Sequence, residues 1–482
     1  MGIPSRPRFA PLRRLRSLLV AVCAPLSAAA QPPNPTTTAD GPPRYTLGLQ
    51  AGLNVVAEQN LYWNLADRFA ADSGFDSDAQ WLEWHLKPSV GFELSRGRWR
   101  GFGALSAVAS GSRGTDAYAA SNASEIDIEE AHLGAICSLD TARSLEASLG
   151  PRALKFGTGM LFSNGGSNGF ERGALKLGPR KSWDQAPLLR LHSGARTYTL
   201  TRLSPNELDS GDNDNRAVVL DGRHDGPDGA YFGITAARVS RSQSPYPQAG
   251  PPGAPPAVLP GARRGLELLD AYGRSRPWHL GSGQLAFTGE WAIQRNTHID
   301  LEAWAARVQA EWRFPDGRGA PRLLAGIQQF SGDDPRTAAL ERFDPLFYEG
   351  SPAAWASGSK SAMVFINSNL RAYNLALTLS PRPRDTVTLR YAHVRAHRLF
   401  SPLQFGQATR PDFANGASNI IAGVTDPHLS DDLFVEYLRI ASRQLYVGAG
   451  LSVSIPGRGI RLAAADTVPR WTGAYLNVVF NY

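Results

Sequence analysis

The sequence predicts an all-β fold, a transmembrane antiparallel β-barrel preceded by a cleaved signal peptide. Three observations indicate it. Beyond Tyr45, one segment after another alternates apolar and polar residues with the period of a strand, and almost none has the period of a helix. Short and long connections alternate over much of the chain. Residues 471–482 form an unbroken alternation that ends on an aromatic residue.

The first 30 residues have the pattern of a secretory signal. Residues 1–30 place arginines and no acidic residue before the apolar run Leu18–Ala24, and the small residues Ala28–Ala30 follow. The apolar run is too short to span a membrane. We therefore expect a flexible mature N-terminus over 31–44 and a barrel over 45–482. Because those arginines supply most of the formal net charge of +7, the rest of the chain gives no reason to expect a nucleic-acid partner.

The alternating segments are long, with tryptophan or tyrosine near the ends of the apolar face. In residues 83–94, for example, Trp84 and Phe92 lie on one face, and Glu83 and Lys87 lie on the other. The same alternation returns in residues 284–293, 303–314, 385–391 and 445–455. Segments of ~10–12 residues exceed the ~5–6 usual in soluble sheets. This favours a lipid-facing apolar band over a soluble all-β secreted protein, which is the alternative.

Two classes of connection separate these segments. Short ones, at 95–98, 315–319 and 380–384, have the chemistry of hairpin turns. Long ones, rich in Gly, Pro, Asp and Asn, span 61–80, 110–125, 163–187, 240–265, 331–360 and 399–428. The pattern is typical of short periplasmic turns and long extracellular loops. At ~25 residues per strand with its connection, the mature chain predicts roughly 16–20 strands around an aqueous lumen.

Composition and motifs exclude several other classes. A mean hydropathy of -0.26 and the lack of a second long apolar run exclude a polytopic helical membrane protein. With 2 cysteines, the chain cannot form a disulfide scaffold or a multi-cysteine metal site. His393 and His397 are four apart, which on a strand separates them by ~13 Å, so we expect no metal there. We expect no cofactor and no enzymatic activity; an esterase or protease with a triad on the barrel rim is the alternative.

The last strand resembles the C-terminal strand of bacterial outer-membrane barrels. Thr472, Leu476, Phe480 and Tyr482 share its apolar face. That family of barrels ends on such an aromatic residue, with apolar residues at alternate positions before it. The resemblance implies insertion into the bacterial outer membrane, with its lipid as the surrounding partner.

Two stretches resemble the alginate export family of outer-membrane proteins. The first runs from Gly326 to Pro335 and contains Ser-Gly-Asp-Asp; Phe-Asp-Pro-Leu-Phe follows at Phe343–Phe347. The second, looser one runs from Gly150 to Leu191, where the family has a Gly-rich strand, a loop and a tryptophan-containing segment, here Trp183–Gln185. The sequence departs from the family at Tyr348 and in its Pro-rich 240–265 loop. The resemblance implies an 18-stranded monomeric barrel that exports a polyuronate.

The faces opposite the apolar ones predict the lining of the lumen. Our candidates for a substrate conduit are Lys155, Arg190, Arg307, Arg313 and Arg390, and the candidate lumen acids are Glu83, Glu290 and Glu311. Alginate carries one carboxylate per sugar, and guanidinium groups pair well with carboxylates. Binding along such a conduit must stay weak enough for release. The acids could also neutralise the arginines in ladders that bind nothing.

Several functions and partners therefore stay open. The leading one is export or diffusion of an anionic polysaccharide or small anionic solute, with periplasmic export partners. The alternatives are a general or small-solute porin, and a structural or adhesive barrel whose 240–265 and 331–360 loops make surface contacts. We expect the neighbouring Asp333 and Asp334 to fix the following loop rather than to bind calcium.

Overall fold

The computed structural model describes residues 41–65, 74–118, 120–252, 254–315, 319–349, 365–404, 420–421, 423–465 and 467–482. The predicted signal peptide and most of the predicted flexible N-terminus lie outside these residues. The first strand begins at Arg44, one residue before the predicted boundary. All described residues belong to one compact unit. Among them, no helix is both long enough and apolar enough to cross a membrane.

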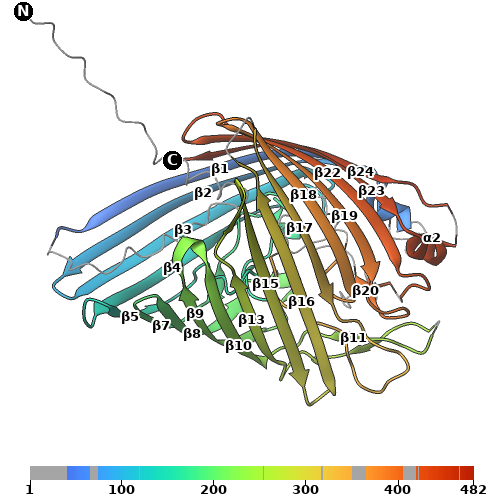
Figure 1. The fold of residues 1–482 in the computed structure, drawn as a ribbon, viewed down its shortest axis with the longest axis horizontal. Coiled ribbons are helices and arrows are strands. Elements are labelled where there is room, and N and C mark those ends of the chain that lie inside the picture. Colours follow the sequence, from blue (N-terminus) through green and yellow to red (C-terminus); the bar gives the residue numbers. More distant parts are fainter. Residues whose placement is uncertain are drawn as a thin grey trace, which may run out of the picture. The chain divides into compact units, whose positions relative to one another are not determined.

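The described chain forms an antiparallel sheet of 20 strands that closes on itself (Figure 1). Two of these strands, β6 (Trp183–Gln185) and β14 (Trp278–Leu280), are three-residue additions, so the barrel wall has 18 strands, as predicted. The wall strands are β1 (Arg44–Gln59), β2 (Ala79–Arg96), β3 (Trp99–Gly114), β4 (Ser124–Ser138), β5 (Arg143–Leu149), β7 (Leu188–Ser193), β8 (Arg196–Pro205), β9 (Arg216–Asp225), β10 (Tyr231–Arg241), β13 (Glu267–Arg274), β15 (Gly283–Asn296), β16 (Leu301–Arg313), β17 (Gly319–Phe330), β18 (Leu370–Arg382), β19 (Asp385–Ala396), β22 (His428–Ile440), β23 (Leu445–Pro456) and β24 (Trp471–Asn481).

Shorter elements lie in the connections. The remaining described elements are strands β11 (Tyr246–Gln248), β12 (Ala257–Leu259), β20 (Leu403–Gln404) and β21 (Ile420–Ile421), the 3-10 helices η1 (Leu61–Asn64), η3 (Phe170–Arg172), η4 (Asp209–Gly211) and η5 (Pro227–Gly229), and helix α2 (Arg458–Ala464).

The first and last strands close the barrel. β1 pairs antiparallel with β24, from Gln50 opposite Asn481 to Gln59 opposite Thr472. At the seam, the Gln50 side chain donates to Asn481 Oδ1 at 2.8 Å. Tyr482 and Leu49 exchange backbone hydrogen bonds of 2.9 and 3.0 Å. Among the described wall strands, closure leaves no unpaired edge, which is what a lipid environment requires of strands.

The two faces of the wall follow the predicted alternation. Large apolar side chains such as Leu105, Ile126 and Leu451 are more than half exposed on the outer face, as lipid contact requires. On the inner face, Glu83 and Glu290 are buried. The segment predicted at 83–94 is confirmed within β2, although the strand extends further at both ends.

Two long connections turn into the barrel instead of staying at its rim. We call residues 150–187, between β5 and β7, the first inner segment, and residues 331–349, after β17, the second inner segment. The predicted loop at 163–187 begins in fact at Gly150, and the Gly-rich stretch expected there as a strand is not one. β5 and β7 span only 7 and 6 residues, because the chain leaves the wall early to enter the interior.

Candidate functional site: a charged constriction inside the barrel

The two inner segments pair with each other through backbone hydrogen bonds. Phe347 N donates to Leu161 O at 2.9 Å, and Ser163 N donates to Phe347 O at 2.8 Å. Phe162 and Phe347 thus form a parallel bridge. Trp183 lies against both rings, with centroid distances of 6.3 Å to Phe162 and 5.3 Å to Phe347. The two stretches that resemble the alginate export family therefore form one aromatic cluster.

Buried carboxylates on the wall hold the first inner segment. Glu83 on β2 accepts backbone hydrogen bonds of 2.9–3.0 Å from Lys176 and Leu177. Glu129 on β4 accepts from Lys181 N and Ser182 N at 2.7 and 2.9 Å. Glu83, a candidate lumen acid, is buried, and its oxygens satisfy backbone donors of this segment. Its role is that of an anchor for the segment.

Glu290 on β15 makes a similar anchor at the tip of the same segment. It accepts from the Thr158 hydroxyl and, at 3.4 Å, from Thr158 N. Gly157, with φ +58°, lies so close that a Cβ there would be 2.8 Å from Glu290 Oε1 and 3.2 Å from Asp270 Oδ2. Only glycine accommodates both the left-handed backbone and this approach. The segment is therefore built to contact a pair of wall carboxyls.

Cationic groups gather beside this anchor. Arg307 on β16 lies directly opposite Glu290 in the strand register and hydrogen-bonds to Gln309. Lys155, on the first inner segment, is an exposed residue. Its ammonium interacts electrostatically with Arg307, Glu290, Lys181 and Glu349. Within the described part of the chain, no hydrogen bond or ion pair is formed by Lys155.

The other predicted conduit arginines lie in ion pairs or elsewhere on the wall. Arg190 pairs with Glu146 at 3.3 Å, and Arg313 pairs with Glu311 at 2.7 Å. Glu311 also faces Arg274 at 3.4 Å and Arg322 at 3.8 Å. Arg390 is half-buried on β19, which β17 and β18 separate from β16. Of the predicted conduit residues and lumen acids, the structure thus brings together Lys155, Arg307 and Glu290. Arg190, Arg313 and Glu311 instead form ion pairs along the wall.

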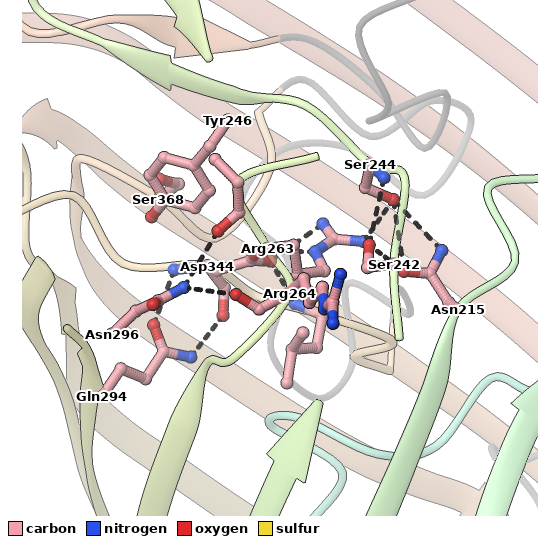
Figure 2. A network of polar contacts seen from close by, with 12 residues as sticks. Asn215, Ser242, Ser244, Tyr246, Arg263, Arg264, Gln294, Asn296, Asp344 and Ser368 are labelled. Carbon is pink, nitrogen blue, oxygen red and sulfur yellow. Dashed lines mark hydrogen bonds and ion pairs between the residues drawn. The ribbon is translucent and has the colours of Figure 1, made fainter. Parts of the chain in front are cut away.

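A second network, which sequence reasoning missed, fixes the second inner segment (Figure 2). Asp344 accepts two hydrogen bonds from the Arg263 guanidinium, at 2.7 and 3.0 Å. Its backbone N–H donates to Gln294 Oε1 at 2.8 Å, and Gln294 donates back to Asp344 O at 2.6 Å. Asp344 is buried. The sequence did contain a signal for this network, namely Asp344 within Phe-Asp-Pro-Leu-Phe. A carboxylate among apolar residues needs a buried partner.

Asp333 and Asp334 fix the second inner segment, as predicted. Asp333 accepts from Ala249 N at 2.7 Å and from Glu341 N at 2.9 Å, and its burial raises its pKa. Hydrogen bonds from Arg336 hold the pKa of Asp334 well below its usual range. These contacts join the start of the segment to the 242–266 connection.

The closed wall, its apolar outer face and the polar interior define an outer-membrane β-barrel of the porin type. The alginate export family matches residues 264–415, which include the second inner segment and the strands beside Arg307. This confirms the resemblance over that part of the chain. A search of curated proteins found no match.

Solved structures share the fold at low sequence identity. A BenF-like porin from Pseudomonas fluorescens Pf-5 matches with a TM-score of 0.54 and 9% identity, over 91% of this chain and 98% of that one. Acinetobacter baumannii OccAB1 gives 0.54 and 9%, over 91% and 96%. Pseudomonas aeruginosa OccK2 (OpdF), solved in complex with glucuronate, gives 0.50 and 13%, over 91% and 96%. At such identities the likeness concerns the fold alone.

Proposed function

We propose that this outer-membrane channel conducts anionic solutes of the uronate class, from single sugar acids to short polyuronates. The observation that carries the proposal is Lys155, an exposed residue inside the barrel whose ammonium interacts electrostatically with Arg307. A carboxylate that passes there meets the Lys155 side chain and the positive potential of the buried Arg307. Lys155 is a mobile point charge, and Arg307 is a planar fork of donors.

The acids nearby limit how strongly an anion binds. Glu290 and Glu349 interact with the Lys155 ammonium, so their negative charges oppose tight capture of a carboxylate. A conducting site needs this balance, because a solute must leave as readily as it enters. The glucuronate bound to OccK2 (OpdF) supports the choice of sugar acids as the first test solutes.

The paired inner segments favour small solutes over long polymers in the state described here. They meet at Phe162 and Phe347 inside the wall, so a polysaccharide passes only where these contacts separate. Export of an alginate-like polymer, with periplasmic partners that open the segments, is the second candidate function. The family match over residues 264–415 favours it.

Single-channel recording in a planar bilayer tests the proposal. We expect a reversal potential of anionic sign under a salt gradient, with block by glucuronate. Lys155→Gln should reduce the anion preference by about fivefold, the factor that corresponds to the ~1 kcal/mol between unit charges at 4 Å in water. Arg295→Gln is the control, because Arg295 lies on the same strand as Glu290 but is exposed and outward-facing.

The outcomes separate the candidate functions. Block by polyuronate as well as by glucuronate would favour export. Conductance without ion selectivity would indicate a general porin. A folded barrel that conducts nothing would leave the structural or adhesive role.

A further inference from the structure

A cluster of metal-binding side chains lies on the outer face of the barrel, apart from the constriction. His393 comes from β19, whereas His428 and Asp431 come from β22. One ligand atom from each residue lies within 4.8 Å of the others. His393 Nδ1 is 2.8 Å from Asp431 Oδ1, and His428 Nε2 is 2.9 Å from Asp431 Oδ2.

The strand register brings these residues together. His393 is directly opposite Asp431 in the β19–β22 ladder. The register shifts after Val394, so that His428 stands opposite Arg395 and its ring reaches the same carboxylate. The two imidazole rings then lie 4.8 Å apart between centroids, tilted by 30°. Both rings thus direct a nitrogen at one carboxyl group.

The surroundings make the cluster accessible to a dissolved ion. Its three side chains are each a little more than a quarter exposed. Tyr391, two residues before His393, is exposed and donates to Asp431 Oδ1 at 2.7 Å. Exposed tyrosines on the outer face mark the boundary between lipid and water. The cluster therefore lies at the end of the apolar band where β19 leaves the wall and β22 re-enters it.

We propose that His393, His428 and Asp431 bind a first-row divalent transition metal, with zinc as the best fit. Two imidazoles and one carboxylate are a ligand set that zinc accepts, with a fourth position left for water. Ligand bonds of ~2.0–2.2 Å place neighbouring ligand atoms a little over 3 Å apart, so small side-chain rotations suffice. Bound metal would clamp the end of β19 to the start of β22.

Zinc binding to the purified, untagged and folded protein in detergent tests the proposal. We expect one Zn²⁺ per chain by equilibrium titration. His428→Ala and Asp431→Asn should each weaken binding by at least about tenfold, since even outer-shell partners of metal sites contribute this much. His279→Ala is the matched control, because His279 is exposed on β14 outside the cluster, and it should bind like the wild type.

A second readout keeps the proposal testable if the alanine variant folds poorly. Asp431→Asn keeps the side-chain shape, and circular dichroism checks its barrel. Zinc should raise the thermal midpoint of the wild type and of His279→Ala, but not that of Asp431→Asn, because a ligand that binds the folded state stabilises it. Absence of zinc binding to the folded wild type, or binding that His428→Ala leaves unchanged, would overturn the proposal.

Discussion

The indole ring of Trp183 meets the Phe347 ring edge to face in the interior of the barrel, with centroids 5.3 Å apart and planes at 79°. Trp183 belongs to the first inner segment and Phe347 to the second. Both are buried, and the Trp183 Nε1–H donates to Leu154 O at 2.9 Å. This contact joins two segments that enter the barrel from different parts of the wall. A change at Trp183 therefore loosens the interior without altering any residue of the 18 wall strands.

Trp183→Ala should therefore open the channel. The substitution leaves a cavity between the inner segments, and losses of ~3–5 kcal/mol are typical for a buried tryptophan. We expect larger and noisier single-channel conductance from a barrel whose circular dichroism is unchanged. Trp291→Ala is the control, because Trp291 is exposed on the outer face. Wild-type conductance in Trp183→Ala would mean that the inner segments do not limit passage.

Glu290→Gln should change ion selectivity in the direction opposite to Lys155→Gln. The amide replaces an ionisable carboxyl opposite Arg307 in the register, while its oxygen still accepts from Thr158. We expect anion preference to rise by about fivefold, on the same Coulomb estimate. Reversal potentials measured in identical salt gradients check it. A shift of the same sign in both variants would contradict the assignment of these residues to one constriction.

Removal of Tyr482 should impair closure of the barrel. The deletion eliminates the two backbone hydrogen bonds with Leu49 at the β1–β24 seam, at ~0.5–1.5 kcal/mol each. We expect a smaller folded fraction in the outer membrane, whereas Tyr482→Phe, which keeps the backbone and the ring, should assemble normally. Equal amounts of folded protein from the deletion and the wild type would refute the role of this strand end.

The loop between β3 and β4 should lose stability as pH rises. Burial raises the pKa of Asp116 from 3.8 to about 6, against the opposing effect of N–H donors from Tyr118 and Ala120. The folded loop therefore favours the protonated acid more than an unfolded loop does. The stabilisation is complete below 3.8 and is lost as pH rises through about 6. Amide hydrogen exchange of residues 115–118 and 120–123, corrected for intrinsic rates, measures the stability of the loop. Protection should fall as pH rises in the wild type but not in Asp116→Asn.

The wall was predictable from sequence because strand periodicity reports directly which face meets lipid. Parity alone assigned Trp84 and Phe92 outward and Glu83 and Glu290 inward, and the two glutamates are buried in the structure. The inner segments were not predictable in the same way. Their Gly-rich composition is equally typical of exposed loops, and what turns them inward is a set of wall carboxylates distant in sequence, such as Glu129.

Strand pairing made two members of the site predictable, whereas Lys155 was also a candidate although it lies on the first inner segment. Glu290 and Arg307 lie on consecutive strands, and both were identified. The partner of Arg190 is Glu146, 44 residues away in the sequence, on the other side of the first inner segment. This pair could not be predicted without knowing that β5 and β7 are neighbours and in which register they pair. His393 was dismissed as a metal ligand because only His397 was considered. Its neighbours His428 and Asp431 become visible once the β19–β22 register is known.

The β1–β24 seam also constrains how the protein is made. Gln50 and Asn481 are 431 positions apart in the sequence, yet they face each other across the closing pair of strands. A contact of such long range forms late, because loop closure must come first. Until β24 arrives, β1 presents an open edge that is prone to pair with other chains. The edge of β1 must therefore stay protected from other chains until the final strand closes the ring.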